Sequence, residues 1–384
     1  MKLKIRCNFD VVKLLDHYFL LSLLFVGCTS VEPEKNTSIS TEYATGFSIE
    51  KKDAFTIITI NDILPNSQKT FRYVLSSNKG KIPSNIVYDG FIKTPVKRII
   101  ATSTTHISYL EELNATATLV GFPETKYISS STVRKRIANN EITDVGKSNQ
   151  LNVERVLELN PDLILSFGVE SIDNSLDRFN KMGIATVFIG EWNEHHPLGR
   201  AEWIKVLGAL LQKSKLSDSI FKNIKVKYNE AKSLVSNLSH KPSVIAGSIY
   251  QDIWYLPGGK SYLAKLLQDA NANYLWSDNL NKGSLGLSVE SVLEKGQNAD
   301  YWFAPGQHTS YSVLNKEHPL YSKFKATQNN KIFTYSKSVG VSGGVLFFES
   351  GACKPDVVLK DIIHHLYPKI TKAYTPYYFL PLNE

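Results

Sequence analysis

The sequence predicts an α/β fold of two lobes joined by a long connecting helix, and three observations support this prediction. Short apolar runs that suit buried parallel strands alternate with amphipathic helical runs in two separate stretches of the chain. A long helical pattern lies between these stretches. Each stretch also contains a copy of nearly the same eight-residue phrase, LNVERVLE at 151–158 and LSVESVLE at 287–294.

The N-terminus has the pattern of an export signal over residues 1–27. Basic residues lead into the apolar run YFLLSLLFVG, which is too short to span a bilayer as a stable helix. The run ends in LFVGC, which resembles the lipobox of bacterial lipoproteins and implies that Cys28 is acylated after cleavage. The protein is therefore expected in the cell envelope, held to the membrane only by a lipid anchor. The alternative is an uncleaved interfacial helix.

Composition narrows the function further. The chain has 384 residues, 42% hydrophobic side chains and a net charge of +8, with lysines scattered along the sequence rather than grouped in a stripe. Nucleic acid is therefore not an expected partner. Without the leader, and with Cys28 acylated, only Cys353 remains as a free thiol, so no intramolecular disulfide is expected.

The first lobe is predicted over residues 47–195, after a polar tether at 28–46 that is rich in Ser and Thr. From 47 to about 90, the runs FTIITI and FRYVL predict a small antiparallel strand extension. Parallel strands follow at KRIIAT, ATLVGF, DLILSF and ATVFIG, with helices at HISYLEELN and NSLDRFNKMG between them.

The connecting helix is predicted over residues 196–214 and the second lobe over 215–384. Pro197 suits a helix start, and Ile204, Leu207 and Leu211 share one helical face. The second lobe repeats the alternation through SVIAGSIY, SYLAKLLQDAN, DYWFAPG and KIFTYS, and ends in the helical run DVVLKDIIHHLY.

The repeated phrase predicts two equivalent helices, one in each lobe. Asn152 and Ser288 precede the first turns as N-caps, which places Glu154 and Glu290 at the same helical position. Such helices begin at the carboxyl edge of the sheet, where open α/β sheets bind their ligands, so both glutamates are expected at the rim of one shared cleft. The alternative is that each carboxylate only complements a helix dipole.

Two longer stretches carry a resemblance to a known family. NVERVLELNPDLIL, and WYLPGGKSYLAKLL followed by ANANYLW, resemble the class III substrate-binding lipoproteins of bacterial ABC importers for iron-siderophores, haem and cobalamin. The resemblance covers roughly residues 95–366 and leaves the role of 47–90 open. It implies a monomer without catalytic activity or a resident cofactor, and a metal complex carried between the lobes. It also implies a permease dimer with its ATPase as partner, docked through Glu154 and Glu290.

The cargo implied by the resemblance is an iron complex, either a ferric siderophore or haem, with cobalamin as the alternative. Only the location of the pocket carries over from the family, namely the loops at the carboxyl edges of the strands. Aromatic residues in these loops suit a large, flat, partly apolar ligand. The candidate ligand-binding residues are His106, Tyr127, Phe167, Trp192, Trp254, Tyr255, Tyr311 and Phe347. For each one the alternative is a place in the core or on the rim, and His106 or Tyr127 is a candidate iron ligand if the cargo is haem.

Enzyme-like signals are weaker. GVSGG at 340–344 fits a nucleophile elbow, with Asp356 and His364 in the chain order of a hydrolase triad, but all three fall within one loop and one terminal helix. An anchored serine hydrolase using Ser342 is therefore the less favoured alternative. GGKS at 258–261 lacks the first glycine of a phosphate-binding loop.

No dedicated metal site is expected either. The pairs His195–His196 and His364–His365 are adjacent in sequence, so their rings diverge on a helix and cannot chelate one ion. A remaining alternative keeps the two-lobed fold but passes the cargo to an outer-membrane receptor. That protein would not need both glutamates.

Overall fold

The computed structural model describes residues 37–39, 41–61, 69–167 and 174–384. Residues 37–384 form one compact unit with a continuous hydrophobic core. The signal segment, Cys28 and most of the expected tether lie outside the described residues. Within the described part of the chain, no helix is long and apolar enough to cross a membrane.

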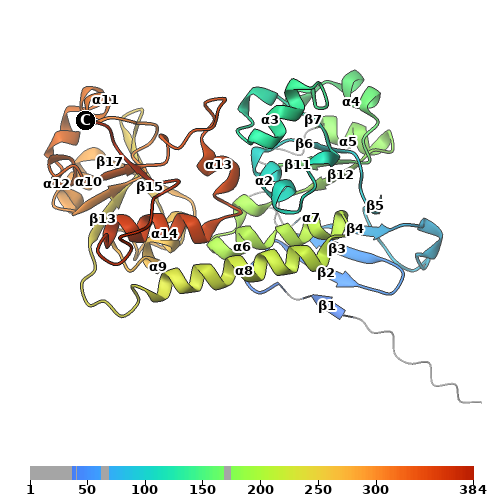
Figure 1. Ribbon diagram of the computed structural model, residues 1–384, viewed down its shortest axis with the longest axis horizontal. Coiled ribbons are helices and arrows are strands. Elements are labelled where there is room, and N and C mark those ends of the chain that lie inside the picture. The colour runs from blue at the N-terminus through green and yellow to red at the C-terminus, as the bar shows by residue number, and fades with distance from the viewer. Residues whose placement is uncertain (1–36, 40, 62–68, 168–173) are drawn as a thin grey trace, which may run out of the picture. The chain divides into compact units, whose positions relative to one another are not determined.

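The first element of the fold is a five-stranded N-terminal sheet in the order β1-β2-β3-β4-β5 (Figure 1). Its strands are β1 (Thr37–Ile39), β2 (Phe47–Lys51), β3 (Thr56–Ile60), β4 (Phe71–Ser76) and β5 (Gly90–Lys93). The first four strands are antiparallel, as the β-branched runs predict, whereas β4 and β5 are parallel.

The first lobe is built on a parallel sheet in the order β12-β11-β6-β7-β8. The strands are β6 (Ile99–Ala101), β7 (Leu119–Phe122), β8 (Thr143–Asp144), β11 (Leu163–Ser166) and β12 (Ala185–Phe188), with a hairpin of β9 (Gly146–Lys147) and β10 (Gln150–Leu151). The helices are α2 (Thr104–Glu112), α3 (Ser131–Ala138), α4 (Val153–Leu159) and α5 (Asn174–Lys181). Short 3₁₀ turns are η2 (Lys79–Lys81), η3 (Thr116–Thr118), η4 (Thr125–Tyr127) and η5 (Glu191–Asn193).

The connection between the lobes differs from the single helix predicted over residues 196–214. It consists of α6 (Pro197–Glu202), α7 (Ile204–Leu210) and the 20-residue helix α8 (Ser214–Ser233). The fully buried Trp203 joins α6 to α7, and Gln212, with a left-handed φ of 55°, ends the helical path before α8. The connection is therefore a layer of helices beneath both lobes rather than one rod (Figure 1). It extends 19 residues beyond the predicted boundary at 214.

The second lobe contains a mixed sheet in the order β16-β13-β18-β19-β20, parallel except at β20. Its strands are β13 (Ser243–Ala246), β16 (Asn273–Tyr274), β18 (Tyr301–Phe303), β19 (Ile332–Thr334) and β20 (Leu380–Pro381). A smaller antiparallel sheet consists of β14 (Ser248–Tyr250), β15 (Ile253–Pro257) and β17 (Ser284–Ser288). The helical elements are α9 (Tyr262–Asp269), α10 (Val289–Gly296), α11 (Tyr311–Glu317), η6 (Pro319–Lys323), α12 (Lys325–Gln328), α13 (Leu346–Ser350) and α14 (Pro355–Leu366).

The two lobes share their capping interactions, as the repeated phrase predicts. The side chains of Asn152 and Ser288 accept hydrogen bonds from the third residues of α4 and α10. Asp162 accepts from two backbone N–H groups just before β6, at 2.8 and 2.9 Å, and Asp300 accepts from the first N–H of β13 at 3.0 Å. Each aspartate thereby ties the central strand of its lobe to the neighbouring strand.

The fold begins earlier than the predicted boundary at residue 47. Two buried carboxylates hold residues 42–46 by their backbone. Glu202 accepts N–H groups from three successive residues, 42–44, at 2.8 to 3.1 Å, and pairs with Lys205 at 2.7 Å. Glu194 accepts from the backbone of 45 and 46 and from the Trp203 indole. The segment expected to be the end of the tether is therefore part of the fold.

Replacing Glu202 by Gln tests this attachment. The amide keeps the size of the side chain but loses acceptor capacity, and it leaves Lys205 buried without its partner. We expect the free energy of unfolding to fall by about 3 to 5 kcal/mol, the usual effect of breaking a buried ion pair. Guanidinium denaturation followed by circular dichroism measures this change in the free energy of unfolding. The exposed Glu158→Gln is the control, and an equally small loss in both variants would contradict the role of Glu202.

Candidate ligand-binding cleft

A cavity of about 1270 Å³ lies between the two lobes. It is larger than typical small-molecule pockets, which measure roughly 300 to 1,000 Å³. The first lobe and N-terminal sheet contribute Thr45, Gly46, Asn61, Gly190, Trp192, Asn193, Glu194, His195 and Arg200. The second lobe contributes a larger set that includes Tyr255, Tyr262, Asn281, Lys282, Ser284, Tyr335, Phe347, Phe348 and Phe379.

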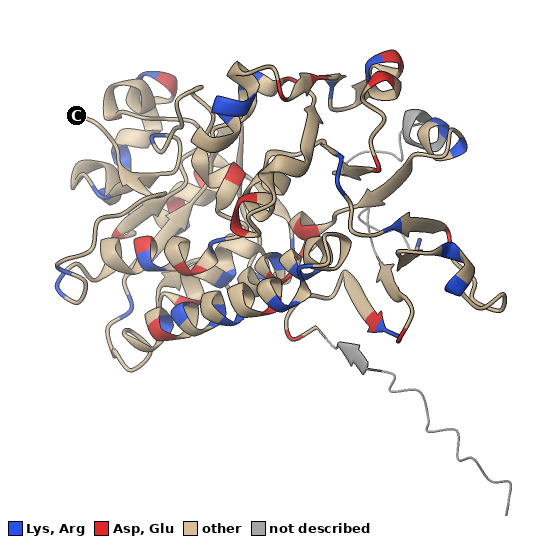
Figure 2. Ribbon diagram, turned by 45° about the vertical axis from the view of Figure 1, so that its right-hand side comes forward, with Lys and Arg blue, Asp and Glu red and all other residues tan. Residues whose placement is uncertain are grey.

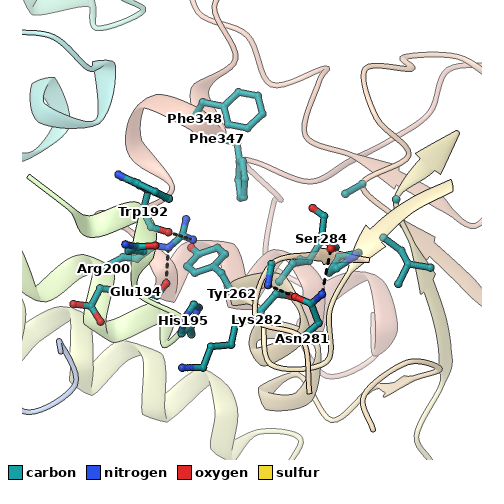
Figure 3. A pocket seen from close by; sticks show the side chains of 18 of the residues that line it. Trp192, Glu194, His195, Arg200, Tyr262, Asn281, Lys282, Ser284, Phe347 and Phe348 are labelled. Atoms are coloured by element: carbon teal, nitrogen blue, oxygen red, sulfur yellow. Dashed lines mark hydrogen bonds between the residues drawn. The ribbon is translucent and has the colours of Figure 1, made fainter. Parts of the chain in front are cut away.

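Arg200 in α6 connects the two lobes within this lining (Figure 3). Its guanidinium donates from Nε to the carbonyl of Glu194 at 3.0 Å and from Nη2 to that of Trp192 at 2.9 Å. The same group lies 3.9 Å from the ring centre of Tyr262 in α9, a cation–π contact that is strengthened by burial. Burial also lowers the pKa of Arg200, which nevertheless remains charged at neutral pH.

The polar part of the cavity carries positive charge. Lys282 is exposed in the cavity wall, and Arg200 is the second cation. Burial, followed by the charges of Lys282 and Arg200, lowers the pKa of His195, so this imidazole is neutral at pH 7. The carboxylate of Glu194 is already engaged by the N–H groups of residues 45 and 46. The cavity therefore favours an anionic ligand.

Aromatic rings form another part of the wall. Phe347 stacks on Tyr335, with centres 4.9 Å apart and planes 10° from parallel, and Phe348 packs against both. Phe347 and Phe348 lie on the side of the cavity away from Lys282, while Trp192 comes from the other lobe (Figure 3). Such surfaces suit a flat ligand that stacks.

A turn of the second lobe fastens the two lobes together. We call residues 340–349 the clasp. Ser342 Oγ donates to the Ile128 carbonyl at 2.8 Å, and Ser129 Oγ donates to the Gly344 carbonyl at 3.1 Å. The buried Glu349 accepts the Ser129 N–H at 2.6 Å. A Cβ at Gly344 would lie 2.6 Å from Ser129 Oγ and 2.8 Å from a backbone carbonyl, so this approach requires glycine.

Residues 99–339 match the family described as periplasmic binding protein. The chain belongs to this family. Two uncharacterized lipoproteins of Methanocaldococcus jannaschii are among its relatives. One is 26% identical over 326 residues, covering 81% of this chain and 76% of the relative. The other is 28% identical over 274 residues, covering 68% of this chain and 69% of the relative.

Solved structures of periplasmic binding proteins share the fold. A periplasmic binding protein from Veillonella parvula has a TM-score of 0.57 at 16% identity, covering 83% of this chain and 94% of its own. A possible iron-binding periplasmic solute-binding protein from Staphylococcus epidermidis has a TM-score of 0.55 at 20% identity. The match covers 71% of this chain and 100% of that one. A periplasmic heme binding protein of Vibrio cholerae has a TM-score of 0.53 at 17% identity. The match covers 68% of this chain and 98% of that one. These similarities confirm the predicted class III fold of two α/β lobes with a helical connection.

Three of the eight aromatic candidates line the cleft of this periplasmic binding protein, namely Trp192, Tyr255 and Phe347. Phe167 does not line it, but its ring centre lies 6.0 Å from that of Trp192. Tyr127 is half exposed on η4 beside the clasp and is not part of the cavity lining.

The other three candidates are placed wrongly by the sequence prediction. Trp254 is fully buried against Trp302 and donates to the carbonyl of Ala246, so it cannot contact cargo. His106 is also fully buried and does not line the cavity, so it cannot bind the iron of a cargo in the cleft. Tyr311 hydrogen-bonds the backbone of β19 outside the cleft.

Glu154 and Glu290 are exposed in the first turns of α4 and α10, as predicted. Neither residue lines the cavity itself. Their helices lie on the outer parts of the two lobes (Figure 1). This separation leaves both carboxylates accessible to another protein.

The hydrolase triad is not assembled. Ser342 donates to Ile128, while His364 Nδ1 lies 2.9 Å from the Thr371 hydroxyl. Burial raises the pKa of Asp356, whose Oδ1 has no hydrogen-bond partner among the described residues. Across residues 37–39, 41–61, 69–167 and 174–384, no group of three or more His, Cys, Asp or Glu side chains is placed to hold a metal ion.

The close approach of two chain segments explains why GVSGG resembles a nucleophile elbow. Glycines around a serine are required wherever a chain must approach another closely, and here the partner is the backbone near Ser129 rather than a substrate. Both roles need small residues and a hydroxyl, so the sequence of the turn does not distinguish them.

Sequence reasoning missed the charged part of the cleft. Arg200 falls inside the predicted connecting helix, and Lys282 resembles many other lysines of this chain. The only available signal was position, since Lys282 follows Asn281 in one of the loops expected at the carboxyl edges. Local sequence does not reveal that Arg200 meets Tyr262 from the other lobe.

The clasp is expected to weaken as the pH rises. Burial raises the pKa of Glu349 from 4.5 to about 7. A raised carboxyl pKa means that the folded state holds the proton more tightly, so the stability from this group is complete below 4.5 and is lost as the pH rises through about 7. A tenfold change in an acid dissociation constant corresponds to about 1.4 kcal/mol, so the loss of folding free energy approaches about 3 kcal/mol.

Glu349→Gln should remove this part of the pH dependence, because glutamine keeps an acceptor for the Ser129 N–H but does not titrate. Denaturation curves of both proteins between pH 4.5 and pH 8 measure the difference. The exposed Glu294→Gln is the matched control. The assignment fails if the free-energy difference between Glu349→Gln and the unsubstituted protein stays constant over this range.

Proposed function

We propose that this periplasmic binding protein is the substrate-binding lipoprotein of an ABC importer. It captures an iron complex, a ferric siderophore or haem, between its lobes and delivers it to a permease dimer driven by an ATPase. Cobalamin is the second candidate cargo. The observation that carries the proposal is the cavity of about 1270 Å³ between the lobes, with cations and stacked aromatic rings in one lining.

The chemistry of the lining favours an anionic cargo with a flat or aromatic surface. Haem carries carboxylates on an aromatic ring, and many ferric siderophore complexes carry net negative charge. Lys282 and Arg200 complement such charges, while Phe347 and Trp192 offer stacking surfaces. Cobalamin also has a large flat ring but gains less from the two cations. Iron- and haem-binding proteins among the structural neighbours support the same choice.

A lipid anchor at Cys28 completes the proposal. The relatives from Methanocaldococcus jannaschii are named lipoproteins. The acylated cysteine would hold the protein at the surface of the membrane that contains the permease. Each exposed glutamate, Glu154 and Glu290, would then pair with an arginine cluster on one half of the permease.

Replacing Lys282 by Ala tests the charge of the cleft. A charge-assisted contact with the cargo is worth about 1.5 to 3 kcal/mol, so the dissociation constant of an anionic iron complex should rise by roughly tenfold to a hundredfold. Fluorescence titration with haem, cobalamin, and anionic and neutral ferric siderophores compares the ligands, and native mass spectrometry verifies the complex. Anionic complexes should bind more tightly than neutral ones of similar size.

Lys260→Ala is the matched control for this titration, since Lys260 is exposed nearby and does not line the cavity. It should leave all affinities unchanged. Equal binding of anionic and neutral complexes, with no effect of Lys282→Ala, would contradict an anionic cargo. Binding of none of these complexes would contradict the proposed cargo class.

Changes at Glu154 and Glu290 test delivery separately from capture. Each Ala substitution should reduce uptake of the cargo by cells, and Arg at both positions should nearly abolish it, because like charges would then meet the permease. Cargo affinity of the purified variants should stay unchanged. Normal uptake by the double Arg variant, or an equal loss of affinity and uptake, would leave the glutamates as helix-dipole partners only.

A further inference from the structure

A second pocket, of about 750 Å³, lies between the N-terminal sheet and the junction of α7 with α8. Its lining includes lysines from both sides: Lys51, Lys52, Lys81, Lys213 and Lys215. We call this the basic pocket. The lysines look scattered along the sequence, but the fold brings these five together. Asp53 is the one carboxylate among the lining residues.

Three of the five lysines have no counter-ion within the described chain. Lys213 is held by the carbonyls of residues 113 and 114, at 2.7 and 2.8 Å, and Lys52 lies 3.7 Å from Glu50. By contrast, no ion pair or hydrogen bond in the described structure engages the side chains of Lys51, Lys81 and Lys215. Five lysines around a single lining carboxylate, Asp53, repel one another, so an anion placed among them would relieve that repulsion.

The surroundings of the basic pocket reinforce the positive potential. Residues 47–98 contain nine Lys and Arg against four Asp and Glu, an excess of five within a chain whose net charge is +8. Figure 2 marks the Lys and Arg positions on the N-terminal sheet in blue. The 20-residue helix α8 also begins at the pocket, with Ser214 and Lys215 in its lining and no side-chain cap at Lys213. Its dipole adds to the lysine charges there.

We propose that the basic pocket binds the phosphate head groups of anionic lipids on the membrane to which the protein is anchored. The proposal rests on the lipid anchor of the proposed function. The first residue of β1, the edge strand of the N-terminal sheet, lies nine positions after Cys28, and nine residues reach at most about 30 Å. The sheet therefore stays close to the membrane surface, where each lysine contributes about 1 kcal/mol, or about fivefold, to binding of anionic lipid.

This placement gives the N-terminal sheet a role that is separate from cargo binding. The sheet precedes the residues that match the family, and its lysines do not line the cleft. Head-group binding would attach the protein to the membrane at the basic pocket as well as at the lipid anchor. The second contact limits the orientations from which the cleft is presented.

Vesicle sedimentation tests the proposal with residues 37–384, which form one compact unit without the anchor. Vesicles of phosphatidylglycerol and phosphatidylcholine in equal parts should bind the protein, binding should fall as salt rises, and pure phosphatidylcholine should not bind it. The triple variant Lys51→Ala, Lys81→Ala, Lys215→Ala should bind the mixed vesicles roughly a hundredfold more weakly.

The control is Lys222→Ala, Lys316→Ala, Lys372→Ala, which removes the same charge from exposed positions outside both pockets. An equal loss in both triple variants would overturn the proposal in favour of net charge alone. Calorimetry with inorganic phosphate gives a further test: tight binding of phosphate without vesicle binding would overturn it in favour of a free-anion site. Cargo titration of the same variants tests the cleft independently, so either proposal can fail without the other.

Discussion

The contact between Arg200 and the ring of Tyr262 is the interaction on which the geometry of the cleft depends. One guanidinium holds two carbonyls of the loop before α6 and lies 3.9 Å from an aromatic ring of the other lobe. The carbonyl of Arg200 also accepts the Tyr109 hydroxyl of α2 at 2.7 Å. Because the planar group meets each partner through a different face or edge, lysine could not replace it. The loop that presents Trp192 and His195 is therefore positioned by the same residue that joins the lobes.

The lobes are joined in two different ways at two places. At the base, α6, α7 and α8 continue from one lobe to the other, and Arg200 adds a buried contact. At the clasp, hydrogen bonds from two serine hydroxyls to backbone carbonyls, and one from a backbone N–H to Glu349, bridge segments more than 200 residues apart in sequence. Opening the base would disrupt packed helical turns, whereas opening the clasp would break its hydrogen bonds and separate α13 from α2.

The sequence predicts the features that depend on local patterns. It does not predict the features that depend on contacts between residues far apart in the sequence. Strand and helix order, the caps at Asn152 and Ser288, and the family all follow from short-range patterns. Trp254 and Tyr255 show the limit. Both lie on β15, where alternate side chains face opposite sides, and the structure buries Trp254 fully while leaving Tyr255 42% exposed. Which side of β15 faces the core depends on how the strand packs, and the sequence of the strand alone does not determine that packing.

Comparing the two lobes distinguishes residues that recur because each lobe must fold from residues that recur for another reason. The caps and the strand-linking aspartates Asp162 and Asp300 recur because each lobe must satisfy the same backbone groups. The cleft residues do not recur, since each lobe meets a different side of one cargo. Glu154 and Glu290 recur although both are exposed and neither forms a hydrogen bond or ion pair through its side chain within the described chain. A carboxylate in a first turn gains only about 0.3 to 1 kcal/mol from the helix dipole, and other first-turn positions would serve equally well. Their identical placement therefore supports the proposed docking to a partner with two equivalent halves.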